Sequence, residues 1–552
     1  MTRFGTVMKR CGLIDYISLE RQNINALQKF VIGSEVETSL DYQRIFYHTD
    51  VSTSIDMTPW LRFFYSLLFL CFITFNAQAS DYDYPKQEIR AVWLTTIYGL
   101  DWPVRIASNE TEQRWQKQDL CDILDRLKEA NFNTVFVQTR LRGDVIYPSQ
   151  IEPASKVFTG YYGSLPNYDP LAFVIDECHK RGMECHAFFV TFPVGSERIV
   201  REQGPLSVVQ RRPELCLFHN GEWLLDPGLP ETADYILSLV QEVVRNYDID
   251  GIQFDYIRYP DKASSFPDQR SYTKYGNGKN LADWRRENIN HLIAYIHDWV
   301  KQEKLWVQVS SSPLGKYERI PQNPRAGWTA YEDVFQDPKA WLQAEKQDMI
   351  VPMMYYRQND FYPFVNNWME QETERNRVVG LGAYRLNEQE GNWNLSEIKD
   401  QMNYARNQGV DGLAFFRTQF VIENEKGLYY ELKNNFFKYP AQLPPLTWMS
   451  ETIPESPREI VVTRENNFLK LSWERSGQED HSYTVYYSLS DGVDTDKAQS
   501  ILATGIRTTE IYLPVDMAIE KEYTFCVTVS NRYRVESKPS YETYYYLSRY
   551  EK

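Results

Sequence analysis

The chain has 552 residues, 43% hydrophobic and 24% charged, which is enough for two or three globular domains with real cores. Its formal net charge is −15 and no basic run or stripe is present, which argues against a nucleic-acid partner because phosphates require clustered lysine and arginine. Aromatic residues reach 15%; they suit carbohydrate clefts, although large barrels and sandwiches also use them as filler.

The first recognisable segment is a secretory signal at residues 57–79. It holds a basic residue, a short apolar run and a small-x-small cleavage site, and the run is short for a membrane span. Because 56 residues of nondescript sequence precede it, we expect translation to start at Met57 and residues 1–56 to be a non-native extension. The mature protein is expected to begin near Ser80, in the periplasm or at the cell surface, with no integral membrane segment.

Five cysteines follow the signal, and their odd number and scatter imply no disulfide framework. They are Cys121, Cys178, Cys185, Cys216 and Cys526. Cys178 and Cys185 flank an expected helix-to-strand junction, where they either pair or remain buried free thiols. No H-x-x-H or C-x-x-C spacing is present, so we expect neither a metal nor a cofactor.

Residues 86–438 alternate short apolar runs with amphipathic helical stretches. The eight expected strands are residues 89–96, 134–140, 184–192, 251–257, 305–313, 349–356, 378–384 and 412–418. This alternation predicts an α/β fold, a (β/α)8 TIM barrel with long loops. The competing doubly wound sheet would need a glycine-rich phosphate turn after its first strand, and none is present.

After the barrel the composition changes. Residues 439–457 are rich in proline and are predicted to be a linker. Residues 458–548 offer short strands at regular spacing, which predicts a small all-β sandwich. Trp473, the central YTVYY and the late YTFCVTVSN resemble a fibronectin type III domain, expected to be a spacer or docking module. Because few contacts are expected to cross the linker, residues 80–445 are predicted to fold alone.

The fourth expected strand carries the leading catalytic candidate. In barrels of this kind the chemistry lies at the carboxyl ends of the strands. Side chains alternate along a strand, so if Ile252 and Phe254 face the helices, Gln253 and Asp255 point into the barrel. Burial of an unpaired carboxylate is costly, which favours a catalytic role for Asp255. The alternative is an ion pair between Asp255 and an arginine such as Arg140.

The other strand ends supply a rim of aromatic rings, amides and arginines, which suits a polyhydroxylated ligand. A phosphate site would instead show a glycine nest, and a redox cofactor would need a nucleotide-binding fold. The candidate substrate-binding residues are Trp93, Arg140, Asp144, Gln253, Tyr256, Arg258, Tyr355, Tyr356, Tyr384 and Arg417. Each of them alone is better explained by structure, and it is their convergence that indicates a site.

Hydrolysis of a glycosidic bond requires a second carboxylate, because one group donates a proton and the other acts as nucleophile or base. The long segment after the fifth strand offers the candidates Glu332 and Asp337, together with Glu318 and Asp333. Asp337 precedes an expected helix, so a helix N-cap explains it equally well. Asp144 is a further candidate, and the sequence does not choose among them.

Six motifs of the barrel region occur in the order EIRAVWLTT, RLRGDVIYPS, WLLDPGLPETADYI, DGIQFDYIRYP, VFQDPKAWL and DMIVPMMYY. Together they resemble the glycosyl hydrolase-like 10 family over about residues 86–437. The resemblance implies a secreted bacterial barrel, and one family member acts as a glycosidase on peptidoglycan strands that lack stem peptides. It points to Asp255 as the catalytic acid. This chain departs from some relatives in having one aspartate in the fourth-strand motif, and in having Pro338 after Asp337 where the family has an aromatic residue.

Three functions are compatible with these features. The first is a secreted glycoside hydrolase that cleaves a bacterial cell-wall glycan, with peptidoglycan strands the leading substrate, by a retaining or inverting two-carboxylate mechanism. The second is hydrolysis of a dietary or host polysaccharide. The third is a non-catalytic glycan-binding barrel, favoured if no second carboxylate lies within catalytic distance of Asp255. The sequence does not indicate the oligomeric state.

Overall fold

The computed structural model describes residues 84–477, 481–515 and 520–548. The expected extension 1–56 and the expected signal 57–79 lie outside these residues. The described residues belong to one unit, Tyr82–Lys552. None of the helices among them is both long and apolar enough to cross a membrane.

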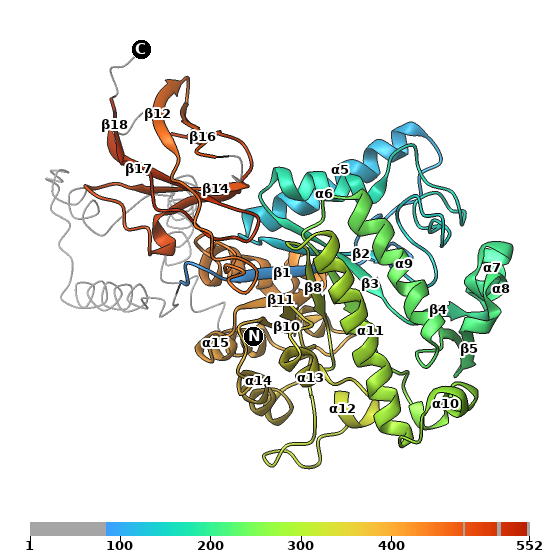
Figure 1. The fold of residues 1–552 in the computed structure, drawn as a ribbon. Coiled ribbons are helices and arrows are strands. Elements are labelled where there is room, and N and C mark those ends of the chain that lie inside the picture. The colour runs from blue at the N-terminus through green and yellow to red at the C-terminus, as the bar shows by residue number, and fades with distance from the viewer. Residues whose placement is uncertain (1–83, 478–480, 516–519, 549–552) are drawn as a thin grey trace, which may run out of the picture. The chain divides into compact units, whose positions relative to one another are not determined.

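Within the described residues, eight parallel strands close into a barrel in the order β1-β2-β3-β7-β8-β9-β10-β11 (Figure 1). They are β1 Ile89–Leu94, β2 Thr134–Arg140, β3 Glu184–Val190, β7 Gly251–Asp255, β8 Gln308–Ser311, β9 Met349–Ile350, β10 Asn376–Gly382 and β11 Gly412–Phe416. Neighbours in the barrel are also neighbours along the chain, so each crossover runs over the outside. The (β/α)8 TIM barrel predicted from the sequence is confirmed.

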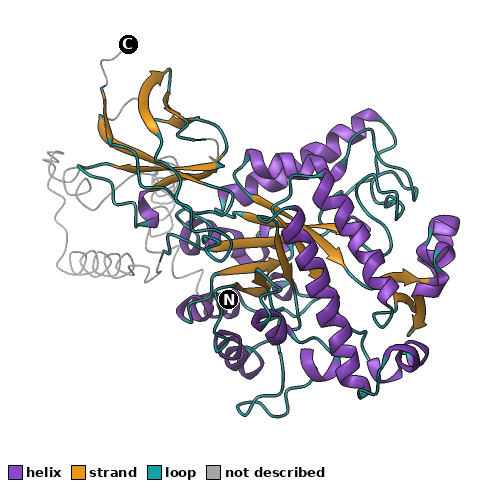
Figure 2. Cartoon of the chain, viewed as in Figure 1, coloured by secondary structure: helices purple, strands orange, loops and turns teal. Residues whose placement is uncertain are grey.

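Helices surround the barrel strands (Figure 2). The longer ones are α5 Glu110–Glu129, α6 Pro170–Lys180, α9 Pro230–Asn246, α11 Leu281–Glu303, α14 Tyr362–Met369 and α15 Leu395–Asn407. Shorter ones are α10 Gln269–Tyr275, α12 Ala330–Asp333, α13 Pro338–Gln343, α16 Thr418–Ile422 and α17 Leu428–Glu431. α5 shows why such segments form: Asn109 caps its first turn, and Leu120, Leu124 and Leu127 form a buried stripe at helical spacing.

The barrel strands are buried on both faces, which explains their nearly continuous apolar sequences. One face packs against the helices. The other forms a smaller interior cluster that includes Trp93, Phe136 and Phe188. Cys178 and Cys185 are buried free thiols in the helix-facing layer.

An insertion between β3 and β7 was not predicted from the sequence. It contains β4 Pro193–Ser196, α7 Glu197–Gln203, α8 Val208–Arg211, β5 Cys216–His219 and β6 Glu222–Leu225. The strands form an antiparallel sheet in the order β4-β6-β5. β5 and β6 are joined at Asn220 and Gly221, whose φ angles of 49° and 86° suit the tight turn of a two-residue hairpin.

The C-terminal part of the described chain is an all-β sandwich of two antiparallel sheets, as predicted. One sheet has the order β12-β13-β16 and the other β15-β14-β17-β18. The strands are β12 Arg458–Glu465, β13 Phe468–Glu474, β14 Ser482–Ser488, β15 Ile501–Ile506, β16 Glu510–Pro514, β17 Lys521–Ser530 and β18 Thr543–Leu547. The assignment to the fibronectin type III class stays a prediction.

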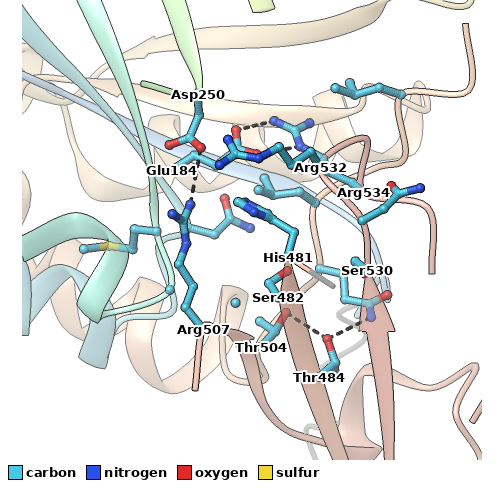
Figure 3. A pocket seen from close by; sticks show the side chains of 18 of the residues that line it. Glu184, Asp250, His481, Ser482, Thr484, Thr504, Arg507, Ser530, Arg532 and Arg534 are labelled. Carbon is cyan, nitrogen blue, oxygen red and sulfur yellow. Dashed lines mark hydrogen bonds and ion pairs between the residues drawn. The ribbon is translucent and has the colours of Figure 1, made fainter. Parts of the chain in front are cut away.

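The sandwich packs against the end of the barrel where β3 and β7 begin (Figure 3). Arg534 donates to Glu184, the first residue of β3, with 2.7 Å between Nε and Oε1. Arg507 pairs with Asp250, just before β7, at 3.4 Å. The linker region contacts the barrel too, because the Trp448 indole donates to Asp348 at 3.1 Å. The structure therefore differs from the expectation that few contacts cross this boundary.

Candidate active site

Asp255 is the last residue of β7, at the carboxyl end of the barrel. Its neighbours Ile252 and Phe254 pack in the helix-facing layer. Strand alternation therefore turns Gln253 and Asp255 toward the interior. Across the barrel, Gln253 accepts a hydrogen bond from the Trp93 indole at 3.2 Å. The carboxyl group thus lies at the mouth of the barrel.

Asp255 is held by hydrogen bonds and not by an ion pair. Its Oδ1 accepts a hydrogen bond from the Tyr256 N–H at 2.7 Å, and its side chain belongs to none of the ion pairs among the described residues. Burial raises the pKa of Asp255, while the Tyr256 N–H, the Arg258 charge and a hydrogen bond from Ser312 oppose that rise. A buried carboxyl with a raised pKa at a barrel mouth is typical of a catalytic acid or base.

The turn after β7 shapes the surroundings of this carboxyl group. Tyr256 adopts a φ of 50°, which is rare for an aromatic residue and costs of order 1–3 kcal/mol. In this conformation its N–H points back to Asp255. The Arg258 guanidinium lies 4.8 Å from the ring centroids of both Tyr256 and Trp328 and pairs with Asp261 at 3.0 Å. The neighbouring loop therefore fixes the arginine beside the tyrosine.

Aromatic rings from the last three barrel strands form a wall beside Asp255. The Tyr355 and Tyr384 rings lie 5.6 Å apart, and each lies 5.8 Å from the ring of Phe416. Burial holds the pKa of Tyr355 well above its usual value, and the negative charge of Asp255 raises it further. Tyr356 follows with Lys316 Nζ 4.6 Å above its ring, and burial raises its pKa to about 12. The structure thus brings Asp255 and three of the candidate tyrosines together.

Asp337 and Glu332 have structural partners in the loop after β8. Asp337 is the N-cap of α13: its Oδ1 accepts from Ala340 N at 3.3 Å and from the Tyr317 hydroxyl at 2.8 Å. Glu332, in α12, accepts from Arg319 N at 3.2 Å and from the Thr329 hydroxyl. None of the contacts among the described residues joins either carboxylate to Asp255. The N-cap explanation that the sequence left open for Asp337 is the one that this geometry matches.

Two candidate arginines are engaged inside the protein. Arg140 is 1% exposed and binds Glu152 through two hydrogen bonds, at 2.8 and 2.7 Å. It therefore neutralises Glu152 and not Asp255, and its position does not match the ligand contact that we predicted. Arg417 pairs with the buried Asp101 at 2.5 Å. Through these ion pairs, the two arginines stabilise the loops that follow β2 and β11.

Asp144 lies in a tight turn after β2. The Arg142 N–H donates to its Oδ1 at 3.0 Å, and burial raises the pKa of Asp144 to about 6. Asp144 also lines a cavity of about 480 Å³, here called the distal cavity. The wall of the distal cavity comes from residues within 97–106, 141–162 and 198–199.

A second cavity of about 260 Å³, here called the proximal cavity, adjoins the turn after Asp255. Its lining includes Arg142, His219, Glu222, Tyr256, Arg258 and Asp261. Glu222 and His219 belong to the inserted sheet and were missed by the sequence reasoning. The Asn-Gly pair between them is a hairpin signal that could have revealed this sheet, although not its position over the barrel mouth. Glu222 is therefore a carboxylate near the barrel mouth that lies on an inserted strand and not at the end of a barrel strand.

The model of the family described as glycosyl hydrolase-like 10 matches residues 88–393. The glycosyl hydrolase YngK of Bacillus subtilis (strain 168) is 31% identical over 512 residues, which cover 88% of this chain and 98% of that protein. The glycosyl hydrolase DigH of Escherichia coli (strain K12) is 34% identical over 371 residues, covering 61% and 84% respectively.

Among solved structures, the glycoside hydrolase domain of PgaB (BpsB) from Bordetella bronchiseptica is similar, with a TM-score of 0.42 and 15% identity. That similarity covers 63% of this chain and 98% of the PgaB domain.

Proposed function

Because the chain belongs to the glycosyl hydrolase-like 10 family and is a glycoside hydrolase, we propose that it cleaves a bacterial cell-wall glycan. The proposed substrate is the peptidoglycan strand without stem peptides, or a related polysaccharide, as the family resemblance implies. The proposed location, periplasmic or at the cell surface, follows from the signal expected at residues 57–79.

The observation that carries this proposal is the environment of Asp255. Its carboxyl is buried, has a raised pKa and lies at the mouth of the barrel, where its charge raises the pKa of Tyr355. A carboxylate in such a site stabilises the oxocarbenium-like transition state through its charge, by attack on the sugar, or by proton transfer. The ring wall of Tyr355, Tyr384 and Phe416 gives the sugar an apolar face to lie on.

The mechanism needs a second carboxylate near the bond that is broken. Glu332, Asp337 and Asp144 were proposed from the sequence, and Asp144 lines the distal cavity. The structure adds Glu222 in the proximal cavity. Replacing each of these four acids by its amide, and measuring the activity of each variant, distinguishes the catalytic acid from the others. A proton donor shows a small defect on substrates with a good leaving group, because these no longer need protonation.

The deciding experiment is Asp255→Asn, which keeps shape and hydrogen-bonding capacity while it removes the charge. On glycan strands freed of stem peptides, with products identified by mass spectrometry, we expect a loss of about three decades in turnover, roughly 4 kcal/mol. The thermal midpoint should stay near that of the wild type. Asp122→Asn, at an exposed position on α5, is the matched control. Near-normal turnover of Asp255→Asn on a confirmed substrate would contradict the proposal.

A further inference from the structure

The distal cavity has the size and lining of a ligand site. Its volume of about 480 Å³ lies within the range of roughly 300–1,000 Å³ that is usual for such sites. Tyr98 and Ile106 contribute to its wall and remain 64% and 56% exposed. Exposed apolar side chains around a concave surface of this kind suit the flat face of a sugar ring.

The charge of this cavity opposes that of the whole chain. Among the described residues that line it there are four cations and one carboxylate, in a chain with a net charge of −15. The cations are Arg105, Arg142, Lys156 and Arg198, and the carboxylate is Asp144. Asp144 is buried and accepts from the backbone of its own turn. Arg105 pairs with Asp119 and Arg142 with Glu222, whereas Lys156 and Arg198 share Glu202, so one positive charge at the mouth of the cavity stays unbalanced.

Lys156 and Arg198 are the two of these cations that remain available to a ligand. Lys156 and Arg198 share one carboxylate, Glu202, and Arg198 lies 3.9 Å from it with a side chain that is 74% exposed. Exposed ion pairs contribute only about 0–1 kcal/mol. A ligand carboxylate can thus replace or join Glu202 at little cost and form charge-assisted hydrogen bonds with Arg198.

The distal cavity adjoins the proposed active site through Arg142. This arginine lines both the distal and the proximal cavity. Its positive charge acts on Tyr256, the residue next to Asp255, and its guanidinium pairs with Glu222 of the inserted sheet. A glycan chain whose bond lies at Asp255 can therefore extend past Arg142 into the distal cavity.

We propose that the distal cavity is a subsite for a saccharide unit that carries a carboxylate, which Arg198 and Lys156 bind at the mouth and Arg142 on the side of Asp255. This inference rests on the proposed glycoside hydrolase function and names the chemical class of unit that the cleft selects. Peptidoglycan strands without stem peptides present such carboxylates, whereas chitin-type strands do not.

The test compares two forms of one substrate. Peptide-free glycan strands are used as isolated and after chemical reduction of their carboxylates to alcohols. Binding of both forms is measured by calorimetry with Asp255→Asn, and cleavage of both with the wild type. We expect about tenfold tighter binding of the carboxylate form, since hydrogen bonds between charged groups are the stronger ones. The preference should shrink as the salt concentration rises.

Substitution of the cations at the mouth tests whether the preference for the carboxylate form arises in the distal cavity. Arg198→Gln combined with Lys156→Gln should bring the two affinities to within about twofold, without a change in thermal midpoint, because both side chains are exposed. Arg212→Gln is the matched control, since Arg212 is an exposed arginine of the same insertion that pairs with Glu214 at 2.5 Å and lies outside the distal cavity. It should keep the full preference.

The outcomes separate the two proposals. Equal binding of both forms by Asp255→Asn, or a preference that survives the double substitution, would overturn the subsite. Carboxylate-dependent binding without any cleavage by the wild type would support the subsite and overturn the proposed substrate.

Discussion

At the scale of single residues, Asp255 differs from three acids of the barrel that each pair with an arginine. Glu152, Asp101 and Glu184 are each bound by an arginine, namely Arg140, Arg417 and Arg534. An acid that is paired with an arginine in this way serves the structure. Asp255 instead accepts a hydrogen bond from the backbone N–H of Tyr256 and takes part in none of the ion pairs among the described residues. It can therefore change its protonation state during a reaction.

Asp144 gives a prediction about stability and pH. Burial raises its folded-state pKa to about 6, above an unfolded value near 4. The folded protein then holds the proton more tightly, so this group's contribution to stability is full below about pH 4 and is lost as pH rises through about 6. The variant Asp144→Asn has no carboxyl group to ionise, so it does not lose stability in this way as the pH rises. Its free energy of unfolding relative to wild type should increase between pH 4 and pH 7, by up to about 3 kcal/mol.

Urea denaturation of Asp144→Asn and the wild type at several pH values measures this difference. Asp122→Asn, at an exposed position, should show a difference that hardly varies with pH. A constant difference for Asp144→Asn would mean that its carboxyl is already ionised in the folded protein at pH 4.

At the scale of elements, the loop between β8 and α13 forms one side of the site. Trp328 lies over Arg258, so this loop helps to hold the arginine beside Tyr256. Short helices fix the loop, and each needs a group for its free N–H donors. Asp337 supplies that group for α13, and Glu332 and Asp333 bond back to Thr329 at the start of α12. The carboxylates of this loop thus hold Trp328 in place.

Asp337 can be assigned by comparing two substitutions. Asn caps helices as well as Asp does, whereas Ala removes the cap at a cost of about 1 kcal/mol, and the hydrogen bond from Tyr317 is lost as well. For a residue that acts as a cap, Asp337→Asn should keep both stability and turnover. Asp337→Ala should lose about 1–2 kcal/mol of stability and keep turnover per folded molecule. If Asp337→Asn loses several decades of turnover with its stability intact, Asp337 is the second catalytic carboxylate.

At the scale of the molecule, the barrel was predictable because its strands are buried on both faces and the helices between them are amphipathic, so each leaves a local pattern. The alternation of Ile252 and Phe254 with Gln253 likewise indicated where Asp255 points. Contacts between segments that come together only when loops fold back leave no such local pattern in the sequence. The Glu152 partner of Arg140, twelve residues further on, and the inserted sheet that brings Glu222 to the barrel mouth depend on how loops fold back.

The same holds for the contact between barrel and sandwich. The proline-rich composition of residues 439–457 suggests a free linker, yet charged side chains of the sandwich meet the start of β3 and β7. Of the acids that pair with an arginine of the sandwich, Glu184 makes the closest contact, and 15% of its side chain is exposed. Burial alone raises the pKa of Glu184, but the charge of Arg534 outweighs it, so the pKa lies well below its usual value. Removal of the sandwich would leave this carboxylate without its main cation, so we expect residues 80–445 alone to be markedly less stable than the full chain.

Arg534→Ala tests that contact in the full chain. Removal of one partner of a buried pair leaves an uncompensated charge and costs about 3–5 kcal/mol, and we expect the low end because His186 still contacts Glu184 at 3.0 Å. Arg532→Ala breaks a more exposed pair with Asp248, 2.9 Å apart, and should cost at most about 1 kcal/mol. Because the pKa of Glu184 is depressed, its stabilisation is present above about pH 4 and is lost as pH falls further. The difference between Arg534→Ala and wild type in urea denaturation should therefore be largest near pH 7 and shrink toward pH 3. Equal losses for the two variants, or a loss that does not depend on pH, would show that the sandwich is held by its apolar contacts and not by the Arg534–Glu184 pair.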